Sequence, residues 1–246
     1  MKVGISLDVR NPPDWHRPWP EFYASVLEAC EEADRLGIDS IWLTEHHFFE
    51  DGYLPQTLTF AGAIAARTSR VRVGTAILIP GLRPALDVAE QAGIVDLLSN
   101  GRLELGLGAG YRVPEFEAFG QDIGRRYELL EEAAAEIKRL WEEGGFTPPP
   151  VQARAPLWIG AHGPRGARLA GALGAGLLSF APRVLAPYRD ALEQAGYGAD
   201  SARLTHVANM IVADDPEAAW PRIAPHLAYQ WNSLTRYGAE GAERGG

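Results

Sequence analysis

Three ionisable side chains, Glu45, His46 and His47, stand next to one another directly after a short apolar run. Residues that follow parallel strands line the active sites of α/β proteins, and a carboxylate beside two imidazoles can transfer protons or contact a bound ring system. The alternative is that these side chains only hydrogen-bond the adjoining loops. Neighbours on an extended strand point to opposite faces, so the three cannot converge on a metal ion without a sharp bend. The chain also has no HxH or HxxxH spacing, and we expect no metal site.

A glycine-rich turn is the second candidate site. Residues 160–166 contain His162, Gly163, Arg165 and Gly166 ahead of a predicted helix. Free backbone N–H groups at a helix N-terminus, glycines that permit close approach and a nearby arginine together suit a phosphate group. An ordinary βα turn also uses glycines, so both interpretations stay open on the local sequence.

Small residues mark two further predicted strand ends. Gly74, Thr75 and Ala76 leave room for a flat group to approach the backbone. Residues 106–111 are superficially similar to a dinucleotide-binding GxGxxG motif, but Tyr111 occupies the third glycine position and the stretch does not open the first βα unit. We therefore exclude a Rossmann site.

The elements that would position these residues alternate along the chain. Short apolar runs are separated by segments of helical period, which is the pattern of βα units and a parallel sheet. Most of the runs are apolar at successive positions, as strands covered on both faces should be. The expected strands are residues 3–7, 40–44, 72–79, 103–107, 157–161, 176–180 and 205–212, and the expected helices are 21–36, 56–68, 84–98, 125–143, 166–173, 185–195 and 216–237.

Seven consecutive units predict an α/β fold of the TIM (β/α)8-barrel type that lacks the eighth βα unit. Residues 238–246 are polar and glycine-rich, so we expect them to form a frayed tail. Three prolines in residues 144–152 favour an extended surface excursion over a packed element. We expect one domain over residues 1–246, because neither flank of the excursion could close a barrel alone.

Composition limits the possible partners. The 246 residues carry 32 acidic and 23 basic side chains, a formal net charge of −9, so the totals do not support a nucleic-acid-binding surface. The single cysteine, Cys30, cannot form an intrachain disulfide and falls on the apolar stripe of a predicted helix, where a small buried hydrophobe is favoured over a reactive thiol. With no signal-peptide pattern and no run of about 18 apolar residues, we expect a cytoplasmic protein without a membrane span.

In this order, the residues resemble the bacterial luciferase-like flavoprotein family, whose members are TIM barrels that use FMN or the deazaflavin F420. The resemblance extends over about residues 1–235. It is carried by residues 37–48, 73–76, Pro80, residues 98–102 and 106–120, Arg126, Glu131 and residues 156–160.

The resemblance implies roles for the first group of residues. Glu45 would shape the flavin site, and His46 would support proton transfer near the reacting flavin carbon, with His47 beside it. The family commonly has a non-proline cis peptide in the third strand, behind the isoalloxazine ring. Here Ala76-Ile77 is its preferred place and Thr75-Ala76 the second.

The resemblance also implies a phosphate site at His162, Gly163, Arg165 and Gly166. Gly108 stands where luciferase alpha chains carry a cysteine near the flavin, and Ala109 stands where they carry an arginine near the phosphate. We therefore expect Arg165 and backbone N–H groups to anchor the cofactor, and we do not expect luminescence.

Aromatic residues crowd three predicted loops, residues 12–19, 48–53 and 111–119. Such a wall suits a small, mostly apolar organic substrate with a few polar groups. Alternatively, the aromatic rings pack the loops against one another.

Three functions stay open. The first is a monooxygenase that uses oxygen and reduced FMN supplied by a separate flavin reductase. The second is an F420-dependent oxidoreductase that transfers hydride, and the third is a shortened, non-catalytic flavin-binding protein. A barrel that lacks one unit leaves a sheet edge uncovered, which predicts a homodimer or a completing partner.

Overall fold

The sheet orders the whole molecule. A computed structural model describes residues 1–179 and 181–242. Seven strands pair in parallel, each with the next along the chain, so β1 and β7 are the two edges of one open sheet. This confirms the α/β class and the strand order of a TIM-type barrel. No eighth strand occurs in the described part. The strands are β1 Gly4–Leu7, β2 Ser40–Leu43, β3 Arg72–Thr75, β4 Leu103–Leu107, β5 Leu157–Gly160, β6 Gly176–Leu178 and β7 Leu204–Thr205.

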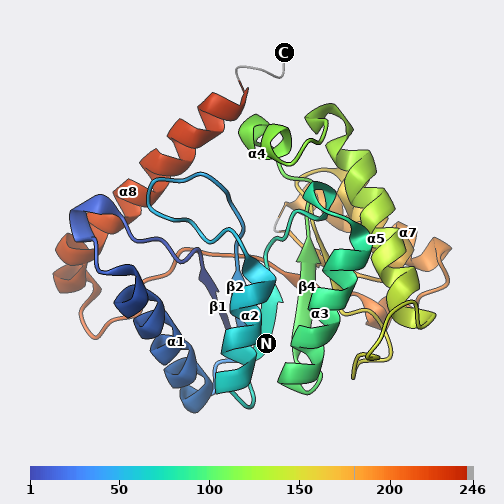
Figure 1. Ribbon diagram of the computed structural model, residues 1–246, viewed down its shortest axis with the longest axis horizontal. Helices are drawn as coiled ribbons and strands as arrows, with labels where there is room; N and C mark the ends of the chain where they lie inside the picture. The colour runs from blue at the N-terminus through green and yellow to red at the C-terminus, as the bar shows by residue number, and fades with distance from the viewer. Residues whose placement is uncertain (180, 243–246) are drawn as a thin grey trace.

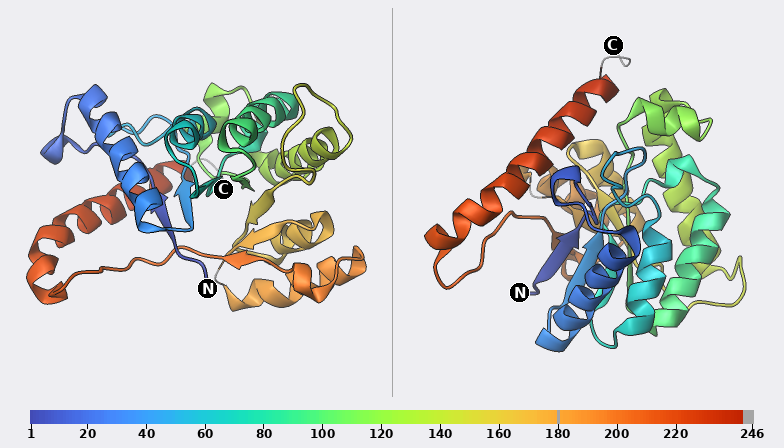
Figure 2. Two further views of the ribbon diagram at one scale, coloured as in Figure 1. Left: turned by 90° about the horizontal axis from the view of Figure 1, so that it is seen from below. Right: turned by 60° about the vertical axis from the view of Figure 1, so that its left-hand side comes forward.

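Helices follow the strands and cover one face of the sheet, with α1, α2, α3 and α5 side by side (Figure 1). The last helix, α8, lies apart from the other helices, on the far side of β1. A long connection leads to it from β7 (Figure 2). The helices are α1 Trp19–Leu36, α2 Thr57–Arg67, α3 Ala85–Ser99, α4 Val113–Ala118, α5 Arg126–Glu142, α6 Pro164–Leu173, α7 Leu185–Gln194 and α8 Pro216–Ala242.

Alternation along the strands divides the side chains between two faces. Ile41, Leu43 and their counterparts in β3, β4 and β5 belong to the main core under the helices. On the other face Trp42 meets Trp158 edge to face, with ring centroids 5.6 Å apart. The indole N–H of Trp158 donates to Glu104 at 2.6 Å. Two aromatic rings thus fill the interior of the curved sheet.

The third strand ends earlier than predicted. We expected residues 72–79, but β3 stops at Thr75, because the Ala76-Ile77 peptide is cis and turns the chain out of the ladder. The preferred position of the cis bond is therefore confirmed. Only an isolated bridge between Leu78 and Leu107 continues the contact with β4.

The seventh strand is also shorter than the predicted 205–212. Only Leu204–Thr205 pair with β6, and the apolar side chains of Val207, Met210 and Val212 beyond them are exposed. Among residues 1–179 and 181–242 no strand lies on the other side of β7, so the apolar alternation there is not used in a ladder. Residue 180 of the predicted sixth strand lies outside the described residues.

Three smaller features add to or differ from the expectations. The sequence did not predict α4. The predicted excursion at 144–152 is a loop, but it is not wholly on the surface. Phe146 anchors it in the main core against Trp141, because burial of the apolar ring is favourable. The predicted tail at 238–246 is helical as far as Ala242, and residues 243–246 lie outside the described residues.

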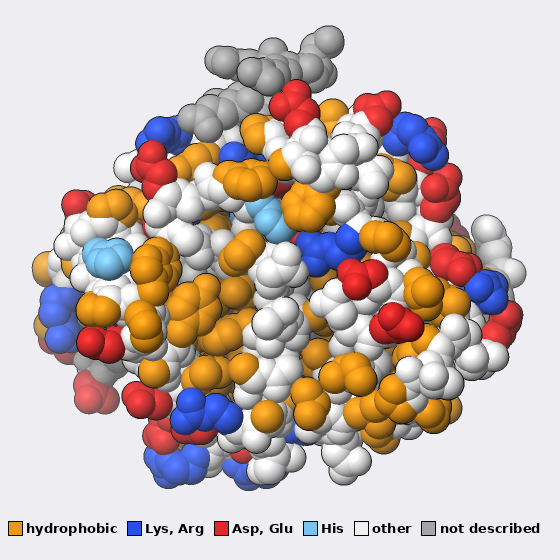
Figure 3. All heavy atoms as spheres, viewed as in Figure 1, with side chains coloured by type: hydrophobic (Ala, Val, Ile, Leu, Met, Phe, Trp, Pro, Cys, Tyr) orange, Lys and Arg blue, Asp and Glu red, His pale blue; other side chains and the backbone are white. Residues whose placement is uncertain are grey.

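Cys30 lies in the core, as predicted. Cys30 is buried, and burial raises the pKa of its thiol to about 11. Acidic and basic side chains lie side by side over α5, where Arg139 pairs with Glu136 and Glu143 (Figure 3). None of the described helices is long and apolar enough to span a membrane.

The tight packing of glycine against tryptophan is testable at Gly74. A β-carbon there would lie 2.5 Å from the Trp42 ring and 3.1 Å from the Glu104 carbonyl oxygen. We expect Gly74→Ala to lower the free energy of unfolding by about 1–3 kcal/mol in urea denaturation. The control is Gly198→Ala, where a β-carbon would meet nothing within 4 Å. Equal stability of the two variants would contradict the packing described here.

Candidate active site

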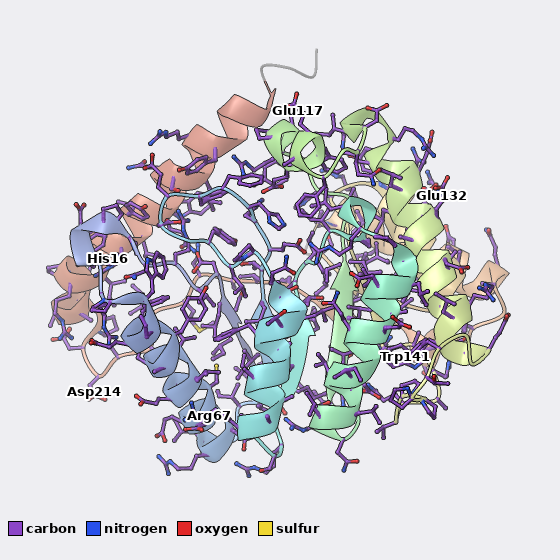
Figure 4. All side chains as sticks on the ribbon, in the orientation of Figure 1. His16, Arg67, Glu117, Glu132, Trp141 and Asp214 are labelled. Carbon is purple, nitrogen blue, oxygen red and sulfur yellow. The ribbon has the colours of Figure 1, made fainter. Side chains whose placement is uncertain are left out.

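The segment after β2 lies at the carboxyl edge of the sheet. Figure 4 shows Glu117, on α4, at this edge, and Arg67, at the end of α2, at the opposite edge. Glu45, in the segment after β2, is buried at the carboxyl edge. Its Oε2 accepts the backbone N–H of Ile79 at 3.0 Å, and its Oε1 pairs with the Arg83 guanidinium. His47 Nε2 lies 3.0 Å from the same Oε1. A carboxylate can only accept, so His47 donates this bond.

His46 turns to the other side of the segment. Its Nδ1 lies 2.9 Å from Glu115 Oε1 and its Nε2 lies 3.1 Å from the Tyr111 hydroxyl, so both ring nitrogens are engaged. Phe49 stacks on the imidazole and Tyr53 meets it edge to face, and His46 is only 8% exposed. Glu45 and His46 thus point in different directions, as predicted from the alternation of neighbouring side chains along a strand.

Glu115 is the buried centre of this arrangement. It belongs to the first turn of α4 and is completely inaccessible to solvent. Besides His46, its Oε1 accepts the backbone N–H of His47 at 2.9 Å and Arg112 Nη1 at 3.0 Å. Burial by itself raises the pKa of Glu115, but the bond from His46, the N–H of His47 and the charge of Arg112 hold this pKa below its usual value. Glu115 is therefore a carboxylate, and His46 Nδ1 must carry the proton that it donates.

Arg112 connects this group to α8. Its guanidinium lies over the rings of Phe49 and Tyr237, 4.6 and 5.1 Å from their centroids, and Nη1 also donates to the His47 carbonyl at 2.7 Å. Tyr237 comes from α8 and packs on Phe49 with centroids 4.0 Å apart. The last turns of α8 thus cover the loop that carries His46.

A second polar contact fixes α8 further along. Arg10, after β1, donates to Asp51 at 2.7 Å and also bonds the Ser233 hydroxyl of α8. The Tyr229 hydroxyl donates to Asp51 at 2.9 Å, and burial together with this carboxylate raises the pKa of Tyr229 to about 12. Two loops of the carboxyl edge and α8 therefore form one packed unit.

Small residues surround Ile77, next to the cis bond. A β-carbon at Gly108 or Gly160 would lie 2.7 or 2.6 Å from the Ile77 side chain. Thr75 is fully buried and exchanges hydrogen bonds with the backbone of Gly106, so its hydroxyl is not directed at a ligand. Ala76 donates its N–H to Leu43. Ile77 and Gly108 thus meet where β3, β4 and β5 end.

The glycine-rich turn after β5 precedes α6. Gly163 is the N-cap, no side chain caps this helix, and a β-carbon at Gly163 would meet nothing within 4 Å. His162 is exposed, and its carbonyl accepts two bonds from Arg183. Arg165 instead pairs with Glu131 of α5 at 2.6 and 2.9 Å. The N-terminus of α6 is open, but the arginine expected beside it is paired elsewhere.

The remaining residues of that turn and the aromatic loops have mixed roles. Gly166 packs closely on Ala161, where a β-carbon would lie 2.8 Å away. The Trp15 ring packs on the ring of His226 in α8, with centroids 4.0 Å apart, so this aromatic side chain attaches its loop to another element. Phe48 and Tyr111, by contrast, are 62% and 49% exposed. They are the most exposed aromatic rings of these three loops.

Sequence reasoning did not assign Arg83, Arg112 and Glu115 to the site. Glu115 stood only within a family-like stretch, and its burial in the first turn of a six-residue helix could not be read from local pattern. A surface hollow formed by α7 and the segment before β7 includes none of the predicted residues. Among the residues described, no group of three or more His, Cys, Asp or Glu side chains could hold a metal ion.

The charge of Glu115 is testable through stability. Glu115→Gln leaves the buried Arg112 without its carboxylate, so we expect a loss of about 3–5 kcal/mol in the free energy of unfolding at pH 7. Because the pKa of Glu115 is lowered in the folded state, its stabilisation is complete above the unfolded pKa and is lost as pH falls through the folded pKa. The difference between wild type and variant in urea denaturation should therefore shrink as the pH is lowered below about 4.

The matched control is Glu90→Gln on the exposed side of α3. It should change stability by less than about 0.5 kcal/mol at either pH. A Glu115→Gln variant as stable as this control at pH 7 would contradict an ionised Glu115.

Comparison with known proteins identifies the family of the chain. The chain is 32% identical over 202 residues to an F420-dependent glucose-6-phosphate dehydrogenase of Amycolatopsis mediterranei, covering 73% of this chain and 60% of that protein. It is 30% identical over 180 residues to the oxygenase component of a flavin-dependent trigonelline monooxygenase of Acinetobacter baylyi, covering 67% and 50%. The chain thus spans about half to three fifths of the length of these relatives.

A crystal structure of a monooxygenase from Streptomyces bottropensis superposes with a TM-score of 0.89 at 26% identity, covering 99% of this chain and 82% of that one. The profile of the luciferase-like monooxygenase family matches residues 1–245. The chain therefore belongs to the luciferase-like monooxygenase family, and the relatives named above depend on F420 or on flavin.

Proposed function

We propose that this protein is a single-domain flavin-dependent monooxygenase, which uses reduced FMN and oxygen to oxidise a small, mostly apolar organic molecule. The observation that carries the proposal is the hydrogen-bonded chain of Glu115, His46 and the Tyr111 hydroxyl. An ionised carboxylate, a fixed imidazole and a phenol in hydrogen-bond contact are suited to move a proton. They adjoin exposed aromatic rings suited to an apolar substrate.

The residues present fit a flavin in two respects. The open N-terminus of α6 at Gly163 suits one phosphate group, because its N–H groups are not capped by a side chain. Ile77, which follows the cis bond and packs closely on Gly108 and Gly160, would form the wall behind a flat ring. These residues, with backbone groups of His162 and Gly166, would hold the cofactor. A bound reduced flavin supplies the electrons and the reaction with oxygen.

The protein's own residues would manage the protons and the shape of the site. Glu115 keeps the proton of His46 on Nδ1 and leaves Nε2 to exchange a proton through its bonded partner. Glu45, neutralised by Arg83, holds the His47 ring and the Ile79 backbone, and so positions the loop. Phe49, Tyr53 and the end of α8 exclude water from the imidazole.

F420 is the alternative cofactor, supported by the F420-dependent relative. F420 differs from FMN in its long acidic tail, which calls for additional cations. Arg165 pairs with Glu131, and Arg183 is bonded to the His162 carbonyl. Arg165 and Arg183 are therefore both engaged, and this favours the single phosphate of FMN. The trigonelline relative is named as an oxygenase component, which supports a separate reductase as the source of reduced FMN.

Cofactor choice and catalysis can be tested together. We expect the purified protein to bind reduced FMN more tightly than reduced F420 in side-by-side fluorescence titrations. His46→Ala should slow the protein-dependent steps of reduced FMN reoxidation by oxygen about 100-fold in stopped-flow absorbance, because it removes the proton-transferring imidazole. His226→Ala, on the outer part of α8, is the control.

Tighter binding of F420 would replace this proposal by a hydride-transferring oxidoreductase. Unchanged FMN binding in His46→Ala, with no oxygen reaction that depends on the protein even in the wild type, would instead favour the non-catalytic flavin-binding alternative.

We also propose that the chain forms a homodimer. β1 and β7 each have an unpaired edge in the described sheet, and Met210 and Val212 beside β7 are 77% and 89% exposed. Open edges and exposed apolar side chains favour association. Sedimentation should give twice the chain mass of 26.7 kDa. A stable monomer at micromolar concentration with a cooperative unfolding transition would contradict this.

A further inference from the structure

We propose that Tyr111 is the group that exchanges a proton directly with the substrate, and that His46 and Glu115 act behind it. The inference deepens the proposed function and rests on it in one respect, namely that a substrate binds at this edge of the sheet. It assigns the contact with the reacting atoms to the phenol instead of the histidine.

Accessibility falls steadily along the three residues. Tyr111 is 49% exposed, His46 is 8% exposed and Glu115 is not exposed. The imidazole is enclosed by Phe49 and Tyr53, and its Nε2 is already bonded to the Tyr111 hydroxyl. A substrate that approaches from solvent therefore meets the Tyr111 side chain before it can meet the imidazole.

The backbone aims Tyr111 at this position. Gly110 has a φ of +70°, a conformation that favours glycine, and a β-carbon there would lie 3.0 Å from Ile79 and Phe116. The turn at Gly110 ends the path of β4 and starts the approach to α4. Tyr111 and Glu115 thereby reach the two opposite nitrogens of one imidazole.

The hydrogen bonds have a single direction when His46 is neutral. Glu115 is ionised, so His46 Nδ1 donates to it, and Nε2 carries a lone pair. The Tyr111 O–H donates to that lone pair. The phenol oxygen keeps its own lone pairs, which can accept from a substrate. Burial, and then the charge of Glu115, raise the pKa of Tyr111, which keeps the phenol protonated at neutral pH.

The proton step balances without another reactant. A substrate O–H bond breaks and its proton moves to the Tyr111 oxygen, while the phenolic proton moves to His46 Nε2. The electron pair of the broken bond stays on the substrate oxygen, and the new positive charge on His46 faces the Glu115 carboxylate. Run in reverse, the same step delivers a proton from His46 Nε2, through Tyr111, to an alkoxide or phenolate oxygen. The substrate class is therefore an apolar molecule with a hydroxyl group, present in the substrate or formed from an oxyanion during the reaction.

The first test needs no cofactor. In 15N NMR of the histidine-labelled protein, Tyr111→Phe should move the His46 Nε2 resonance to that of an imidazole nitrogen without a hydrogen bond. The control is Tyr53→Phe, since the Tyr53 ring also packs on His46 but its hydroxyl bonds Thr44. The control should leave that resonance in place. An unmoved His46 resonance in Tyr111→Phe would overturn the proposal.

The second test separates proton exchange from simple positioning of His46. 4-Nitrophenol is a small aromatic hydroxyl compound whose absorbance reports its ionisation. Bound to the wild type, it should ionise at least about tenfold more readily than in solution, because its proton passes to Tyr111 and on to His46. In Tyr111→Phe the ring still blocks the imidazole, and the ionisation of the probe should return to its solution value.

The outcomes of the second test are decisive. If Tyr111→Phe retains the shift, His46 accepts the proton itself and the proposal is wrong. If the wild type shows no shift, the proposal is equally wrong. Tyr197→Phe, at the end of α7, should match the wild type. Because neither measurement contains flavin, failure here is distinct from failure of the proposed monooxygenase activity.

Discussion

The burial of the Glu115 carboxylate is the constraint on which the site depends. A carboxylate without access to water must be compensated, and here Arg112, His46 and the backbone N–H of His47 all converge on one of its oxygens. These partners come from the loop after β2 and the segment that leads into α4. The same interaction therefore joins two strand ends, orients the imidazole and decides which of its nitrogens carries the proton.

The rest of the molecule keeps that interaction dry and in place. Arg112 lies over the paired rings of Phe49 and Tyr237, so the end of α8 covers the charged group. The Arg10 and Asp51 contact to Ser233 and Tyr229 fixes α8 at a second point. Below the site, the tryptophan pair and the strand glycines fill the interior of the sheet, which gives the strand ends a rigid support. Helix α8, the last in the described chain, thus holds in place side chains that come from the chain's first half.

Local pattern predicted much of the fold and only part of the site. The seven βα units, the divergence of Glu45 from His46 and the burial of Cys30 follow from period and alternation, while the position of the cis bond at Ala76-Ile77 came from the family resemblance. The partners of the histidines could not be found in this way, because Glu115 and His46 are 69 residues apart and meet only through the sheet. The length of β7 was overestimated, since an apolar alternation does not reveal whether a neighbouring strand exists. The pairing of Arg165 with Glu131 likewise depends on how α5 and α6 pack.

The tautomer of His46 tests the account most directly. In free imidazole either nitrogen can carry the proton, but an ionised Glu115 requires it on Nδ1 and leaves Nε2 as the acceptor of the Tyr111 hydroxyl. 15N NMR of the cofactor-free wild-type protein at neutral pH distinguishes the two nitrogens. We predict a protonated Nδ1 and an unprotonated, hydrogen-bonded Nε2. A neutral His46 with its proton on Nε2 would contradict the central role assigned to Glu115.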